Sequence, residues 1–189
     1  DVVARSVAQK LQETWGQGVV VESRAGAGGA TGADAVARAQ GDGYTLLVTS
    51  ASTHVIAPVL RKQMPYDAQK DFAPIALVAY GPTAVVVHPS VPVQSLADLV
   101  RYAKANPGKV AYASSGVGTI LHLSGELFAY RTGTDLLHVP YKGAVPASTD
   151  LLSGQVQLMF DSITNAAPQV KAGKLRALPR CATVFCRPG

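Results

Sequence analysis

The chain has 189 residues and a net charge of +5, with 48% apolar and 15% charged residues. Its length and apolar content suffice for one or two domains with a real core, and no apolar run approaches the ~18 residues that span a membrane. The basic residues are scattered and aromatic residues make up only 6%, which argues against a nucleic-acid-binding surface.

Helical and strand-like patterns alternate along the chain. The first half predicts helices over residues 3–15, 33–39 and 56–60, and strands over residues 19–22, 44–49 and 75–79. The second half predicts strands over 84–88, 110–113, 136–139 and 156–160, and helices over 96–103, 120–130, 147–152 and 165–172. This alternation indicates an α/β fold with mostly parallel sheets, in which ligands bind beyond the carboxyl ends of the strands.

Residues 109–130 combine a strand, a small polar turn at residues 114–119 and a helix with apolar residues at Ile120, Leu123, Leu127 and Tyr130. The first turn of a helix has unpaired N–H groups and a partial positive charge. Glycines let the backbone approach a ligand, and nearby hydroxyls add hydrogen-bonding groups. We therefore predict that the turn grips a carboxylate. The alternative is an ordinary strand-to-helix turn in which Thr119 is a plain N-cap.

Two further polar side chains are placed near this turn by the predicted elements. Asp161 ends an apolar strand, so we expect it either to accept a hydrogen bond from a ligand or water, or to cap the helix that follows. His122 lies on the helix three residues after Thr119 and is placed to face the turn. The remaining histidines, His88 and His138 among them, are expected to be packed or surface residues.

Enzymatic alternatives have weaker support. The glycine run at residues 26–32 suggests a nucleotide site, but the next strand ends in Thr49 without the acidic residue that would hold a ribose. Ser115 beside His122 suggests a small hydrolase, but the chain has no G-x-S-x-G motif. No spacing of His, Asp or Glu resembles a metal site. We predict no cofactor, no metal and no catalytic residue, with a nucleotide-dependent oxidoreductase or a small hydrolase as the alternative.

Six sequence motifs occur in a fixed order: GAGGATGADAVARA, DGYTLLVTSASTHVI, MPYDAQKDFAPIALVA, YASSGVGTILHLSGELF, HVPYKGAVPASTDLLSGQVQLMFD and KAGKLRAL. They closely resemble the Bug family, the substrate-binding proteins of tripartite tricarboxylate transporters, over about residues 3–178. The resemblance implies a non-enzymatic periplasmic binding protein of type II-like fold, with two α/β domains and a ligand cleft between them. It also implies a small carboxylate ligand (a di- or tricarboxylate, an acidic amino acid or an aromatic acid) and the membrane components of the transporter as partners.

The resemblance also implies the positions that hold the ligand. They are Ser52, Thr53, His54, Ser115, Gly116, Gly118, Thr119, His122, Tyr141, Lys142, Gly143 and Asp161.

The same resemblance divides the chain into a partial first domain at residues 1–81, a second domain at 82–178 and an atypical tail at 179–189. Family members have a strand and a glycine-rich loop before the segment that opens this chain, and they continue beyond the equivalent of residue 178. We therefore expect a chain shortened at both ends. A truncated product that binds no ligand is a further alternative.

Overall fold

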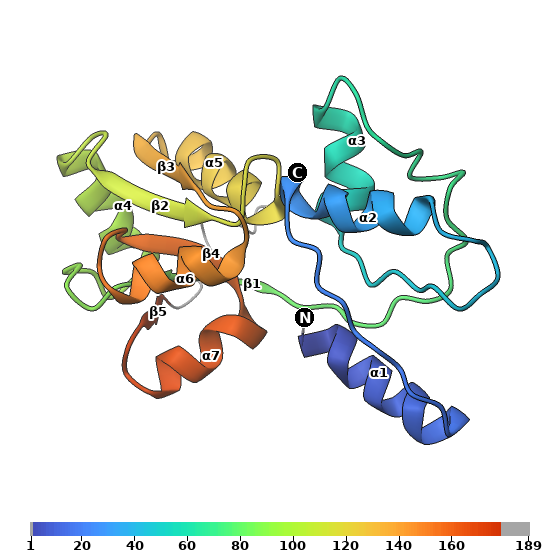
Figure 1. The fold of residues 1–189 in the computed structure, drawn as a ribbon. Coiled ribbons are helices and arrows are strands. Elements are labelled where there is room, and N and C mark those ends of the chain that lie inside the picture. The colour runs from blue at the N-terminus through green and yellow to red at the C-terminus, as the bar shows by residue number, and fades with distance from the viewer. Residues whose placement is uncertain (1, 179–189) are drawn as a thin grey trace. The chain divides into compact units, whose positions relative to one another are not determined.

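The computed structural model describes residues 2–178, so the predicted tail at 179–189, with Cys181 and Cys186, lies outside the described residues. The chain forms two compact units, with the boundary between Tyr80 and Gly81. Each unit has its own apolar clusters of buried residues, and Figure 1 shows the helices and strands of both units. Within residues 2–178, every helix is too short or too polar to cross a membrane.

Unit 1 is built from helical segments and irregular chain. Its helical elements are α1 (Val2–Trp15), η1 (Ala27–Gly29), α2 (Ala30–Ala37), η2 (Ser52–Ile56) and α3 (Ala57–Leu60). A small apolar cluster forms where Tyr66 packs with Ala30 and Ala33 of α2. The ring of Phe72 meets Tyr66 edge-on at a centroid distance of 5.5 Å. The helices predicted for this unit are present as α1, α2 and α3, with shifted ends.

The three strands predicted in unit 1 are wrong. Residues 19–22, 44–49 and 75–79 have the apolar, β-branched composition of strands but form no β-ladder within the described chain. Side chains that a sheet would cover are exposed instead, as at Val20 and Leu77. A strand is stabilised by hydrogen bonds to a neighbouring strand and by packing on one face. These segments lack the inter-strand hydrogen bonds within residues 2–178, although Leu47 packs against the apolar cluster of the unit. Composition alone therefore overstated the strand content.

Unit 2 alternates strands and helices as predicted. Its elements are β1 (Thr83–Val87), α4 (Leu96–Ala105), β2 (Val110–Ser114), α5 (Ile120–Thr132), β3 (Leu136–Pro140), α6 (Ala144–Leu152), β4 (Leu158–Ser162), α7 (Ile163–Lys171) and β5 (Arg176–Leu178). Ser95 is the expected N-cap of α4, since its side chain accepts the N–H of Asp98 at 3.1 Å. The sequence analysis missed the short strand β5.

The sheet of unit 2 is mixed, with the order β3-β2-β4-β1-β5. Strand β2 is parallel to β3 and β4, whereas β1 is antiparallel to β4 and β5. The α/β class is confirmed, and the sheet is mixed because β1 runs antiparallel to both of its neighbours. Apolar periodicity identifies a strand without giving its direction, and β1 enters the sheet from the opposite end.

The central strands β1, β2 and β4 of unit 2 are buried on both faces between two layers of helices, which gives three layers (Figure 1). Along β1, Val85 and Val87 face a cluster that includes Leu99 of α4 and Phe128 of α5. The alternate residue Val86 faces the second cluster, formed with α6 and α7. This alternation follows from the two-residue period of a strand. The carboxyl ends of β2, β3 and β4 are consequently aligned along one edge between the two helical layers.

Helix α5 forms where predicted, but with a different inward face. Ile120, Leu127 and Tyr130, predicted to share the apolar face, are all exposed, while Gly125 and Phe128 are buried. The reason is the size of the tyrosine beneath the helix: Tyr112 of β2 packs against Gly125, where no side chain intervenes. The helix is therefore oriented by a glycine contact, which the spacing of apolar residues does not predict.

Candidate functional site

The turn between β2 and α5 depends on two glycines with left-handed backbone conformations. Gly116 has φ of 130° and Gly118 has φ of 80°, values that favour glycine over residues with a Cβ atom. A Cβ on Gly116 would lie 3.4 Å from the carbonyl oxygen of Tyr141. The turn is closed by the N–H of Thr119, which donates to the carbonyl oxygen of Gly116 at 3.3 Å. The glycines at positions 116 and 118 thus allow a tight turn between β2 and α5.

Thr119 is the N-cap of α5, as the structural alternative predicted. Its buried Oγ1 accepts the N–H of His122 at 3.3 Å and donates to the carbonyl oxygen of Gly116 at 2.8 Å. The hydroxyl is therefore used within the turn. The N–H groups of Ser115 and Val117, by contrast, have no acceptor among residues 2–178. Exposed N–H donors beside a helix N-terminus are suited to an anion.

Strand register brings the other predicted segments of unit 2 to the same edge. Ser114 pairs with Pro140 on one side of β2, and Ala113 pairs with Met159 on the other. One or two residues further along, Ser115 is level with Tyr141 and Asp161. The N–H of Tyr141 donates to the carbonyl oxygen of Ser114 at 3.0 Å, which joins two of the loops directly. The sites predicted after β2, β3 and β4 are therefore neighbours.

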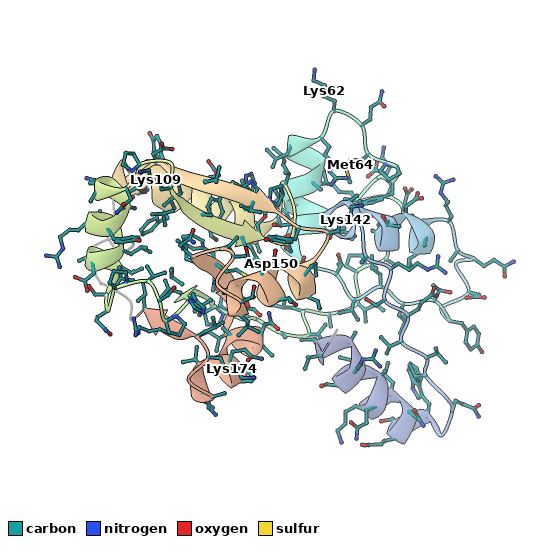
Figure 2. The ribbon with its side chains drawn as sticks, turned by 60° about the vertical axis from the view of Figure 1, so that its left-hand side comes forward. Lys62, Met64, Lys109, Lys142, Asp150 and Lys174 are labelled. Carbon is teal, nitrogen blue, oxygen red and sulfur yellow. The ribbon has the colours of Figure 1, made fainter. Side chains whose placement is uncertain are left out.

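The loop after β3 is held by its tyrosine. The Tyr141 hydroxyl donates to Oδ2 of Asp150 on α6 at 2.7 Å, and burial together with this carboxylate raises the pKa of Tyr141 to about 12. Gly143 precedes α6 with φ of 122°, another backbone conformation that favours glycine. Lys142 lies between Tyr141 and Gly143 in the sequence, and its side chain is exposed. Figure 2 labels Lys142 and Asp150. This loop adds a positive charge to the edge.

Asp161 is not the cap of α7, and its role as a ligand contact stays a prediction. It lies within β4 rather than after it, and Ser162 caps α7 in its place by accepting the N–H of Asn165 at 3.3 Å. The Asp161 carboxylate accepts the N–H of Ser162 at 2.8 Å and the Asn165 amide at 2.7 Å. Burial of this side chain, which is 4% exposed, raises the pKa of Asp161. Through these two hydrogen bonds, Asp161 holds the start of α7 in place beside the turn.

A polar network beneath the turn was missed by the sequence analysis. His138 Nε2 lies 2.7 Å from the hydroxyl of Ser114, which also accepts the N–H of Gly116 at 3.2 Å. The Tyr112 hydroxyl donates to Glu126 at 2.6 Å. These partners come from strands and a helix far apart in the sequence, so only the register of the sheet reveals them. The expectation that His138 is a packed residue is confirmed.

The predicted residues of unit 1 form their own packed cluster. Ser52 and Thr53 are buried in η2. Thr53 donates to the carbonyl oxygen of Gly28 at 3.3 Å, and its own carbonyl oxygen accepts the hydroxyl of Tyr66 at 2.9 Å. His54 lies against the aromatic rings of this cluster, and burial lowers its pKa. The glycine run that suggested a nucleotide is thus packed on η2.

The chemistry of unit 2 is that of binding. The pair Ser114 and His138 resembles part of a hydrolytic triad, but Ser114 is 0% exposed and a substrate carbonyl has no access to its hydroxyl. Within residues 2–178, His, Cys, Asp and Glu do not gather in groups of three or more that could hold a metal ion. An edge that carries unpaired N–H donors and a lysine is suited to a small anion.

Comparison with known proteins places the chain in a family. Residues 3–183 match the family described as the tripartite tricarboxylate transporter family receptor, and the chain belongs to this family. Its members are solute-binding proteins and not enzymes, the class that the sequence resemblance predicted. BugT of Bordetella pertussis is 41% identical over 179 residues, which cover 94% of this chain and 55% of BugT. The chain spans about half the length of the curated relatives that it matches.

Solved structures of similar sequence share the fold. A Rhodopseudomonas palustris protein, Rpa4515 with adipate, superposes with a TM-score of 0.92 at 38% identity, covering 94% of this chain and 60% of that one. MatC (Rpa3494) from the same organism, with bound malate, superposes with a TM-score of 0.86 at 34% identity, again covering 94% and 60%. The fold is therefore the α/β fold of the periplasmic binding proteins.

Proposed function

We propose that this chain is part of a periplasmic solute-binding protein that captures a small carboxylate for a tripartite tricarboxylate transporter. The observation that carries the proposal is the turn at residues 115–119, whose free N–H groups lie at the start of α5. Membership of the receptor family supports transport as the purpose of binding. The adipate and malate bound by two structural relatives support a dicarboxylate as the class of ligand.

The predicted ligand-binding residues divide into donors and supports. The unpaired N–H groups of Ser115 and Val117 would meet the carboxylate, with Gly116 and Gly118 shaping the turn and Lys142 adding a positive charge. Thr119, Tyr141 and Asp161 would hold the surrounding loops in place through the hydrogen bonds described above, and Gly143 through its backbone conformation. Ser52, Thr53 and His54 remain the ligand-binding residues proposed for unit 1.

A ligand screen by thermal unfolding tests the proposal. The 189-residue chain is heated with adipate, malate, citrate, glutamate or benzoate, and with NAD and ATP to test the enzymatic alternative. A ligand that binds only the folded state stabilises it by RT ln(1 + [L]/Kd), about 2.7 kcal/mol at a hundredfold excess over Kd. We expect at least one carboxylate to raise the melting temperature and the nucleotides to have no effect. Stabilisation by a nucleotide alone would contradict the proposal.

A matched pair of threonine variants tests the location of the site. Thr119→Ala removes the N-cap of α5 and the hydrogen bond that closes the turn, so we expect carboxylate affinity to fall by about tenfold or more. Thr149→Ala is the control, because Thr149 is an exposed residue of α6 whose hydroxyl bonds only to the carbonyl oxygen of Val145. Equal losses of affinity in both variants would place the site elsewhere.

A further inference from the structure

Three aromatic side chains are layered beneath the turn of the candidate site. The ring of His122 lies 4.2 Å from that of His138, and the ring of His138 is stacked 4.8 Å from that of Tyr112. His122 comes from α5, His138 from β3 and Tyr112 from β2. The layer therefore ties together the helix and the two strands that carry the turn and its neighbouring loop.

His122 is hydrogen-bonded to the turn itself. Its Nδ1 accepts the N–H of Gly118 at 3.2 Å. A neutral imidazole has one nitrogen that accepts and one that carries a proton, so this bond places the proton on Nε2. Nε2 lies 3.8 Å from Oε1 of Glu126, one turn further along α5. Both nitrogens of His122 thus face groups of the protein.

His138 holds the other glycine of the turn through a serine. Its Nε2 lies 2.7 Å from Oγ of Ser114, and the same Oγ accepts the N–H of Gly116. The two glycine N–H groups are therefore both bound inward, each linked to a histidine. The N–H groups of Ser115 and Val117, which alternate with them, are left without an acceptor within residues 2–178.

We propose that His122 is a positioning residue for carboxylate binding, holding Gly118 through Nδ1 so that the intervening N–H groups stay available to the ligand. This inference rests on the proposed function, since it concerns the same turn. It changes the part assigned to His122, which the sequence resemblance treated as a ligand contact. A direct contact would have to use Nε2, the nitrogen that is turned toward Glu126.

Two amide substitutions separate these roles. The side-chain oxygen of asparagine is attached to Cγ, as Nδ1 of histidine is, whereas that of glutamine is one atom further out and reaches the position of Nε2. If His122 positions Gly118, carboxylate affinity should decrease in the order wild type, His122→Asn, His122→Gln, with the glutamine variant weaker by about tenfold. If His122 contacts the ligand through Nε2, glutamine should retain more affinity than asparagine, and that order would overturn the proposal.

The ligand-free protein supplies a test that does not depend on finding the ligand. Nuclear magnetic resonance of the isotope-labelled 189-residue chain should show a coupling across the hydrogen bond between the Gly118 nitrogen and Nδ1 of His122. Exchange of the Gly118 amide proton should stay slow in His122→Asn and become faster in His122→Gln. A missing coupling in a protein that binds carboxylate would overturn the positioning role alone. A coupling in a protein that binds no carboxylate would overturn the proposed function and the inference with it.

Discussion

A Cβ atom on Gly125 would lie 2.3 Å from Cε2 of Tyr112 and 2.6 Å from its Cζ. Helix α5 therefore rests on β2 through a glycine, and the ring beneath it is completely buried. Distances this short are not compatible with a real Cβ contact, so a side chain at position 125 would force the closely packed ring or the helix to shift. The position of α5, and with it the position of the turn at residues 115–119, depends on this contact.

The first prediction concerns Gly125→Ala. In an exposed helix this change stabilises by up to about 1 kcal/mol, because glycine is a poor helix former. Here it overpacks the core, which typically costs about 1–3 kcal/mol, so we expect the free energy of unfolding to decrease despite the better helix propensity. The measurement is urea unfolding followed by circular dichroism.

A double-mutant cycle identifies the cause. Replacing the ring in Tyr112→Leu removes the atoms that the new Cβ meets, so Gly125→Ala should cost less in that background than in the wild type. The Tyr112 hydroxyl is present in both proteins of the first comparison and absent from both proteins of the second, so its bond to Glu126 cancels within each comparison. Equal costs in the two backgrounds would show that the destabilisation has another origin.

This contact also shows why the sequence predicted the helix but not its orientation. Spaced apolar residues predicted a helix beginning after Thr119, and α5 begins there. The same spacing placed Ile120 and Tyr130 on the buried face, whereas both are exposed. Periodicity is read from apolar side chains, and a glycine that packs closely against a neighbour has no side chain that would signal the contact. The inward face was set by the size of Tyr112, which belongs to another strand.

The turn itself was predicted from local rules, and its supports were not. Positive φ at Gly116 and an N-cap at Thr119 follow from the residues in sequence, because glycine tolerates left-handed backbone and threonine caps helices. The bond between Ser114 and His138 joins residues 24 apart in the sequence. Its existence depends on β2 and β3 being adjacent and parallel, which periodicity does not specify.

The second prediction concerns the pH dependence contributed by Asp161. Burial raises the pKa of this carboxyl above its value in the unfolded chain, while bonds from Asn165 and Ser162 oppose the shift. The folded protein therefore holds the proton more tightly than the unfolded chain does. It follows that Asp161 makes folding more favourable as the pH falls through the raised pKa, and that this contribution is complete below the ordinary aspartate pKa of about 3.9.

Asp161→Asn removes this titrating group and its contribution. We expect the wild type to become more stable relative to the variant as the pH falls from above the raised pKa of Asp161 to below the ordinary aspartate pKa of about 3.9. Urea unfolding at a series of acidic pH values measures the difference. A wild-type advantage that shrinks toward acid would contradict the assigned direction.

The third prediction compares two glycines of unit 1. Gly29 has φ of 96° and Gly43 has φ of 84°, so alanine at either position meets the left-handed penalty of about 1–2 kcal/mol. A Cβ on Gly29 would also lie 2.6 Å from Oγ1 of Thr53, whereas a Cβ on Gly43 would have no heavy atom within 4 Å. We expect Gly29→Ala to cost about 1–3 kcal/mol more than Gly43→Ala, since only the first overpacks a buried side chain.

The single tryptophan of the chain, Trp15, lies in unit 1, so its fluorescence during urea unfolding reports on this unit. The difference between the two alanine variants isolates the contact with Thr53, because the backbone penalty is common to both. Adding Thr53→Ala to Gly29→Ala should recover part of the loss, as it removes the atom that the new Cβ meets. If the two glycine variants lose equal stability, then Gly29 is required only for its backbone conformation, and η2 is not packed on the glycine turn as tightly as the distances indicate.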